Sequence, residues 1–146
     1  MGKIKNRIIS LAAACLFAVG LLPSAVSADD EPILFVNGKD IIAAENNTVQ
    51  CGTGKAVYDA ATHTLTLDNA QITEHTKDGD MPTTGRGAIY AMYTPLKIVL
   101  VGDNSIDIDG DNYQYAYGIY VWEQNLTISS ENKGSLTIAS NNRTIE

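Results

Sequence analysis

The chain is poor in cysteine and in positive charge, and it has no hydrophobic run long enough to cross a bilayer. Only two of its 146 residues are cysteines, Cys15 and Cys51, and Cys15 lies in an apolar N-terminal stretch. One remaining thiol cannot form an internal disulfide, which excludes a disulfide scaffold. A catalytic thiol would need a histidine partner, but His63 and His75 fall in polar, turn-like segments. We therefore expect Cys51 to be an inert, partly buried thiol.

The N-terminal stretch has the layout of a cleavable secretory signal. Three basic residues precede the apolar residues 8–22, which are followed by Pro23 and the small-residue site Val26-Ser27-Ala28. The apolar run is too short for a transmembrane helix. We expect residues 1–28 to be removed, to take no part in the packed domain, and to send the protein to the cell surface or the medium.

Positive charge is scarce after this signal. Residues 29–146 contain seven Lys and Arg against seventeen Asp and Glu, a net charge of −10. Nucleic acids and anionic lipids attract basic surfaces, so this charge argues against either as a partner.

Helical periodicity is also missing. No window keeps apolar residues at helical spacing for three turns, whereas short alternating runs separated by Asn-Gly and Gly-Asp-Asn turns recur. The runs are Ile33 to Val36, Thr64 to Leu67, Leu96 to Ile98, Ile106 to Ile108, Leu126 to Ile128 and Leu136 to Ile138. The sequence predicts an all-β chain.

What the chain does have is an internal repeat. Ala88-Ile89-Tyr90, Leu96-Lys97-Ile98 and Ile106-Asp107-Ile108 each return thirty residues later, as Gly118-Ile119-Tyr120, Leu126-Thr127-Ile128 and Leu136-Thr137-Ile138. Ala56-Val57-Tyr58, Leu65-Thr66-Leu67 and Ile72 form a looser first copy, at offsets of 32, 31 and 34 residues. Three strands per copy without a helix favour a parallel β-solenoid of about three coils over an antiparallel sandwich. We assign residues 29–55 to an N-terminal β segment or cap and residues 56–146 to the coils.

Stacked coils would place equivalent residues in columns. The inward columns are Ile89 and Ile119, Leu96 and Leu126, Ile98 and Ile128, Ile106 and Leu136, and Ile108 and Ile138. The outward columns are Tyr58, Tyr90 and Tyr120, then Met92 and Trp122, then Thr66, Lys97 and Thr127. Because the final coil has no polar cap, we expect the natural protein to continue beyond residue 146 with further coils and domains.

These residues carry a family resemblance. The run from Val57 to Ala70, Tyr117-Gly118-Ile119-Tyr120-Val121 and Gly134-Ser135-Leu136-Thr137-Ile138 resemble the secreted repeat proteins of anaerobic Gram-positive bacteria described as carbohydrate-binding domain-containing. The resemblance covers the chain from about Leu34 onward. It implies a right-handed parallel β-helix at the cell surface or in secreted polysaccharide-handling proteins.

The aromatic residues of the last coils are the candidate binding site. Sugar rings stack their C–H faces on aromatic planes, and outward aromatic side chains beside Asn, Gln and Glu suit a short polysaccharide segment. The candidate ligand-binding residues are Tyr90, Tyr115, Tyr117, Tyr120 and Trp122. The alternative is that these rings only stabilise adjacent coils, which would leave a structural stalk or adhesin segment.

Metal and catalytic sites are not expected. Asp103, Asp107, Asp109 and Asp111 could offer carboxylates to calcium, but the EF-hand pattern fails, and we expect a solvated turn. A β-helix lyase or hydrolase would need a long groove and either paired carboxylates or a basic residue beside calcium. Arg86 and Arg143 are the only arginines after the signal, and neither is near the acidic run. We therefore expect a non-catalytic module without a cofactor.

Overall fold

The computed structural model describes residues 30–77, 86–108, 116–139 and 143–145. Their regular structure is strands, with one 3-10 turn at Glu45–Asn47. The strands are β1 (Ile33–Val36), β2 (Lys39–Asp40), β3 (Thr48–Cys51), β4 (Gly54–Asp59), β5 (Thr64–Asp68), β6 (Gln71–Ile72), β7 (Arg86–Met92), β8 (Leu96–Asp107), β9 (Ala116–Trp122), β10 (Leu126–Ala139) and β11 (Arg143–Ile145). The all-β prediction is confirmed. Within these ranges, no helix is long and apolar enough to cross a membrane.

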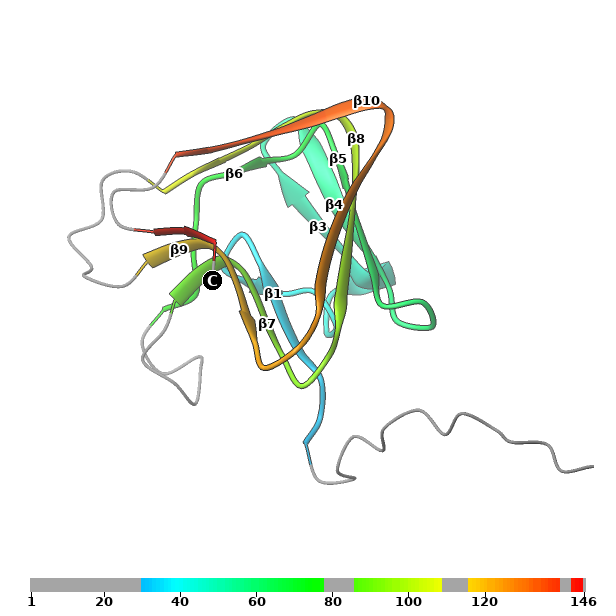
Figure 1. The fold of residues 1–146 in the computed structure, drawn as a ribbon, viewed down its shortest axis with the longest axis vertical. Coiled ribbons are helices and arrows are strands. Elements are labelled where there is room, and N and C mark those ends of the chain that lie inside the picture. Colours follow the sequence, from blue (N-terminus) through cyan, green and yellow to red (C-terminus); the bar gives the residue numbers. More distant parts are fainter. Residues whose placement is uncertain (1–29, 78–85, 109–115, 140–142, 146) are drawn as a thin grey trace, which may run out of the picture.

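The strands form two mixed sheets (Figure 1). The first has the order β11-β9-β7-β1-β2, and the second has the order β10-β8-β5-β4-β3, with β6 paired to β8. From β7 onward the chain alternates between the two sheets, so that β7, β9 and β11 lie side by side in one and β8 and β10 in the other. Figure 1 shows β10 following β8 around a sharp corner.

The strand pairs from β7 onward have the predicted parallel register. Ile98 lies beside Ile128, and Tyr90 lies beside Tyr120, in each case thirty residues apart on parallel strands. Ile106 pairs with Ile138 rather than with Leu136, because the strands go out of step between Glu131 and Ser135. The predicted neighbours Ile98–Ile128 and Tyr90–Tyr120 are therefore confirmed.

The strands β1 to β4 differ from the prediction because they pair antiparallel with their neighbours. β5 and β6 do pair parallel with β8, and Ile72 lies beside Ile106 at the predicted offset of 34 residues. β4 lies between β3 and β5 in an antiparallel meander, and the strand beside β7 is β1, also antiparallel. Ala56-Val57-Tyr58 is therefore not a first copy of Ala88-Ile89-Tyr90. The tight turn after β4 explains this pairing: the Asp59 carboxylate accepts the Ala61 N–H at 2.9 Å, and His63 has a φ of 51°. Such a turn returns the chain at once, which a solenoid coil does not allow.

The position of Tyr58 is a second correction. It was expected in an outward column with Tyr90 and Tyr120, but it lies in the other sheet opposite Leu65 and is buried in the core. The register of β5 also differs, because Leu65 lies beside Ile98 and not Leu96. Lys97 consequently has Thr64 and Thr127 as neighbours, and Thr66 lies beside Val99.

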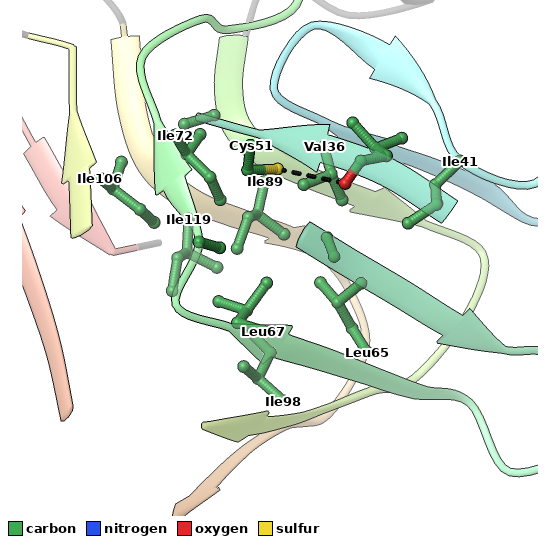
Figure 2. Close-up of a cluster of buried hydrophobic side chains, with 14 of the residues drawn as sticks. Val36, Ile41, Cys51, Leu65, Leu67, Ile72, Ile89, Ile98, Ile106 and Ile119 are labelled. Carbon is green, nitrogen blue, oxygen red and sulfur yellow. Dashed lines mark hydrogen bonds between the residues drawn. The ribbon is translucent and has the colours of Figure 1, made fainter. Parts of the chain in front are cut away.

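One apolar core fills the space between the sheets (Figure 2). Ile89 and Ile119 reach it from the first sheet, and Leu65, Ile98 and Ile106 reach it from the second. Each is at most 1% exposed. Full burial of such a side chain contributes roughly 1.5–3 kcal/mol.

The inward columns become less buried toward β10. Ile128 is 41% exposed, although its neighbour Ile98 is fully buried. Leu126, Leu136 and Ile138 are only partly buried against the core. The prediction that these columns are buried holds for their members on the inner strands. It fails for Ile128, because β10 is the last strand of its sheet in the described chain. The predicted signal, residues 1–28, lies outside the described residues.

Candidate functional site

An apolar surface covers the face of the first sheet that points away from the core. Strand pairing sets it out in two rows across β1, β7 and β9. The first row is Phe35, Tyr90 and Tyr120, and the second row is Ile33, Met92 and Trp122. The intervening residues of β1, β7 and β9 point the other way, into the core. We call these six residues the outer apolar face.

The aromatic rings on this face are stacked. Tyr90 and Tyr120 have ring centroids 5.0 Å apart and an interplanar angle of 15°. Trp122 continues the series, 6.2 Å from Tyr120 at 22°. Tyr117 packs against Tyr120 in a tilted contact at 5.1 Å. The hydroxyl of Tyr90 donates to the Met92 sulfur at 3.7 Å, which places this polar atom within the cluster.

Most of the predicted binding residues are therefore buried. Tyr90 is 0% exposed, and Tyr117 and Tyr120 are each 7% exposed. The expectation that they form an open platform is wrong, because these three rings are buried. Trp122 is the exception at 39%. Tyr115 lies outside the described residues.

The outer apolar face also contains residues that the sequence analysis missed. These are Ile33 and Phe35, and Tyr93, outside the six residues, packs with them against the tyrosine cluster. The run Ile33-Leu34-Phe35-Val36 is apolar at every position, which is the pattern of a strand covered on both faces. Because these residues were assigned to an N-terminal cap, the sequence analysis did not place them beside the tyrosines.

Three polar residues follow Trp122 in the chain. The chain leaves β9 through Glu123, which has a φ of 52°, and continues through Gln124 and Asn125. All three are exposed. The tip of β9 thus combines one accessible indole with one carboxylate and two amides. Indole offers a flat apolar face, and the polar groups offer hydrogen bonds.

Cys51 is not a reactive thiol. It is 0% exposed, and its sulfur lies 3.6 Å from the carbonyl of Val49 (Figure 2). Burial raises the pKa of Cys51 from its ordinary value of 9.0 to about 11. Since the thiolate is the nucleophile, this environment suppresses reaction at neutral pH.

A histidine and two hydroxyls meet where β7 turns into β8. The Thr94 hydroxyl lies 3.0 Å from His63 Nδ1 and 3.2 Å from the carbonyl of Pro95, and the Tyr58 hydroxyl lies 3.3 Å from the same nitrogen. A hydroxyl beside an imidazole is the arrangement of an activated nucleophile. Thr94 is, however, only 1% exposed. A substrate therefore cannot reach its oxygen, and the cluster ties the corner to the β4–β5 turn.

The acidic run does not form a metal site in the described chain. Asp103 is exposed and accepts a hydrogen bond from the Ser135 hydroxyl at 2.8 Å. Asp107 is also exposed, and Asp109 and Asp111 lie outside the described residues. Among the described residues, no three His, Cys, Asp or Glu side chains gather closely enough to hold a metal ion.

A shallow polar hollow of about 290 Å³ lies beside β3, β4 and β5 of the second sheet. Its lining residues are Gln50, Thr53, Gly54, Lys55, Asp68 and Asn69. The hollow has no aromatic side chain, so it lacks the flat apolar surface that a sugar ring needs.

Comparison with known proteins identified no relative of this chain. The chain matches no family model, no curated protein and no solved structure.

Proposed function

We propose that this chain is a secreted or cell-surface carbohydrate-binding module without catalytic activity, and that Trp122 is its principal sugar contact. The observation that supports the proposal is the 39% exposure of Trp122 beside Glu123, Gln124 and Asn125. One ring of a polysaccharide would stack on the free part of the indole, and its hydroxyls would bond to the neighbouring carboxylate and amides.

Tyr120 has a supporting part in this proposal. It stacks on Trp122 at 22° from within the apolar cluster, and so fixes the orientation of the indole before a ligand arrives. A fixed ring loses little side-chain freedom on binding. The contact area is nevertheless that of one aromatic ring, so we expect an affinity on the order of millimolar per site, with useful retention only when several copies act together.

We also propose that the strands from β7 onward form a right-handed parallel β-helix. The support is the alternation of β7, β8, β9 and β10 between the two sheets in parallel register. Parallel crossovers are right-handed in about 98% of cases. An experimental structure with a left-handed crossover, or with antiparallel pairing of β8 and β10, would overturn this assignment.

A glycan array tests the binding proposal directly. Wild-type protein should bind at least one polysaccharide, Trp122→Ala should abolish that binding, and Trp122→Phe should retain part of it because a phenyl ring still stacks. Ile42→Ala is the matched control, since Ile42 is another exposed apolar side chain, 37% accessible, on a different part of the chain. Binding that survives Trp122→Ala would refute the assigned contact.

The second candidate is a structural stalk or adhesin segment. The burial of Tyr90 and Tyr120 favours it, because these rings join neighbouring strands and leave little aromatic surface for a ligand. Absence of binding to every glycan on the array would favour the stalk. Release of reducing ends or unsaturated products from the same polysaccharides would instead indicate an enzyme.

A further inference from the structure

Charge is unevenly distributed between the two ends of the first sheet. β7 and β9 run parallel, so their last residues, Met92 and Trp122, lie at one end of the sheet. β1 runs the opposite way, and Ile33 lies beside Met92. The segment before β1 therefore lies at the same end as the segment after β9, and Figure 1 shows the described chain beginning beside the corners that follow β7 and β9. We call this end of the sheet the tryptophan end.

The segments at the tryptophan end carry negative charge. Asp30 and Glu31 precede β1, and Glu123 follows β9. All three side chains belong to exposed residues. The segment that follows β7, residues 93–95, contains no charged residue. The three described segments that meet at this end thus contribute three carboxylates and no basic side chain.

The basic residues of the first sheet and its flanks lie away from this end. Arg86 begins β7 and Arg143 begins β11, which places both at the opposite end of the sheet. Lys77 is also near that opposite end, because the residue before it donates its N–H to the carbonyl of Gly87 at 3.1 Å. Lys39 lies on the edge strand β2, which pairs with the half of β1 farther from the tryptophan end.

Lys97 follows the corner after β7 but belongs to the second sheet. It lies there between Thr64 and Thr127 on the neighbouring strands. The next residue, Ile98, points into the core, and Lys97 is exposed on the outer face of the second sheet. Its ammonium group therefore projects from a different side of the molecule than the outer apolar face.

The carboxylates of the tryptophan end are close enough to act on a ligand at the indole of Trp122. β7 separates β1 from β9, so these two strands lie about 10 Å apart at the usual strand spacing. Exposed charges interact over a Debye length, which is about 10 Å at 0.1 M salt. Glu31 contributes at low ionic strength, and Glu123, next to Trp122 in the chain, also contributes at higher ionic strength.

An exposed indole bordered by carboxylates suits a positively charged sugar. An ammonium group is attracted to the face of an indole ring. A carboxylate gives the same ammonium group a charge-assisted hydrogen bond. A uronic acid or a sulfated sugar would instead meet charge of its own sign, and a neutral N-acetylated sugar would gain the stacking contact without the attraction between opposite charges.

We propose that this site selects polysaccharides of amino sugars with free ammonium groups, bound by Trp122 together with Glu123 and Glu31. The inference rests on the proposed function, because it names the class of sugar that stacks on the same indole. The pyranose ring lies on the indole, and the carboxylates at the tryptophan end attract its ammonium group. The net charge of −10 over residues 29–146 favours the same class, since it attracts a cationic polymer and repels an anionic one.

Two oligosaccharides of equal length test the selection for charge. One is an oligomer of glucosamine with free amines, and the other is its N-acetylated form, which lacks the positive charges. In NMR titrations at mildly acidic pH, the wild type should bind the free-amine oligomer at least about threefold more tightly. Raising the salt concentration should reduce this preference. Equal affinity for the two oligomers, or tighter binding of the acetylated one, would overturn the proposal.

Neutral variants of the carboxylates test the assigned residues. Glu123→Gln should weaken binding of the free-amine oligomer about two- to fivefold and leave binding of the acetylated oligomer unchanged. Glu31→Gln should have a smaller effect in the same direction. The matched control is Glu131→Gln, because Glu131 is an exposed glutamate on β10 of the second sheet. A combined E31Q/E123Q variant that keeps the full preference would contradict the assignment.

Trp122→Ala separates this inference from the proposed function. If the wild type binds both oligomers equally and Trp122→Ala abolishes both, the indole is the sugar contact and the selection for charge is wrong. The same conclusion follows if neither oligomer binds but another glycan binds through Trp122. If the wild type binds no glycan at all, both proposals are wrong.

Discussion

Asn104 joins three successive strands at the corner of the second sheet. Its side-chain oxygen accepts the Ala70 N–H at 2.8 Å, and its amide group donates to the carbonyls of Val101 and Ser135 at 3.2 and 3.1 Å. The residue is only 3% exposed. A buried amide with these partners replaces backbone pairs that the bend in β8 leaves unmade.

We predict that Asn104→Ala lowers the free energy of unfolding by about 2–4 kcal/mol, because it leaves the Ala70 N–H and the Ser135 carbonyl without these partners. Urea denaturation would measure the loss. Asn125→Ala, at an exposed asparagine, should change stability by less than about 0.5 kcal/mol. Equal effects at the two sites would contradict the structural role of Asn104.

Cys51 gives the molecule a pH dependence in the alkaline range. Its pKa is raised by burial to about 11 in the folded protein from an ordinary 9.0, so the folded state holds the proton more tightly than the unfolded state. The resulting stabilisation is complete below pH 9 and is lost as the pH rises toward 11. We predict that Cys51→Ala removes this part of the pH dependence, as measured by unfolding between pH 8 and pH 11.

The same burial should slow chemical modification. At pH 8, the raised pKa alone reduces the thiolate fraction of Cys51 about 100-fold relative to the unfolded chain. We predict that iodoacetamide labels Cys51 at least about 100-fold more slowly in native protein than in urea. Rapid native labelling would show that the thiol is accessible.

At the scale of the elements, residues at equivalent positions on neighbouring strands are not equally buried. Ile98 is fully buried between Leu65 and Ile128, whereas Ile128 is 41% exposed at the edge. We predict that Ile98→Ala costs about 2–5 kcal/mol of unfolding free energy and Ile128→Ala less than about 1 kcal/mol. Urea denaturation of the two variants makes the comparison. Similar losses of unfolding free energy for the two variants would mean that Ile128 is covered in solution.

Sequence predicted the parallel elements because their strands pair with near-copies of themselves. Like residues thirty apart, such as Ile98 and Ile128, indicate adjacent parallel strands without knowledge of the turns. Ala56-Val57-Tyr58 misled the same reasoning, because an alternating β pattern is compatible with either strand direction. The turn at Ala60 to His63, not the strand, decided the antiparallel pairing.

The sequence predicted which way the side chains of the candidate site point, but not how exposed they are. Alternation along β7 and β9 correctly turned Tyr90, Tyr120 and Trp122 away from the core. Exposure depends on the neighbours across the sheet. Phe35 belongs to that surface through β1, a strand that lies at least fifty residues before β7 in the sequence but pairs directly with it. A single-strand pattern contains no information about such a neighbour.

At the scale of the whole molecule, stability should be highest along the middle of each sheet. β5, β7 and β8 have strands on both sides, whereas β2 and β10 lie at the edges of the described sheets. We predict that amide hydrogens of β7 and β8 exchange slowest and those of β2 and the outer side of β10 fastest. Slow exchange throughout β10 would contradict this order.

The stacked rings of Tyr90, Tyr120 and Trp122 have an optical consequence. Trp122 is the only tryptophan in the chain, and its ring lies 6.2 Å from that of Tyr120. Rings this close exchange excitation energy, so light absorbed by the buried tyrosines is emitted by one indole at the tip of β9. The tryptophan emission therefore reports on a single place in the molecule. The near-ultraviolet circular dichroism of the coupled rings disappears when that stack comes apart.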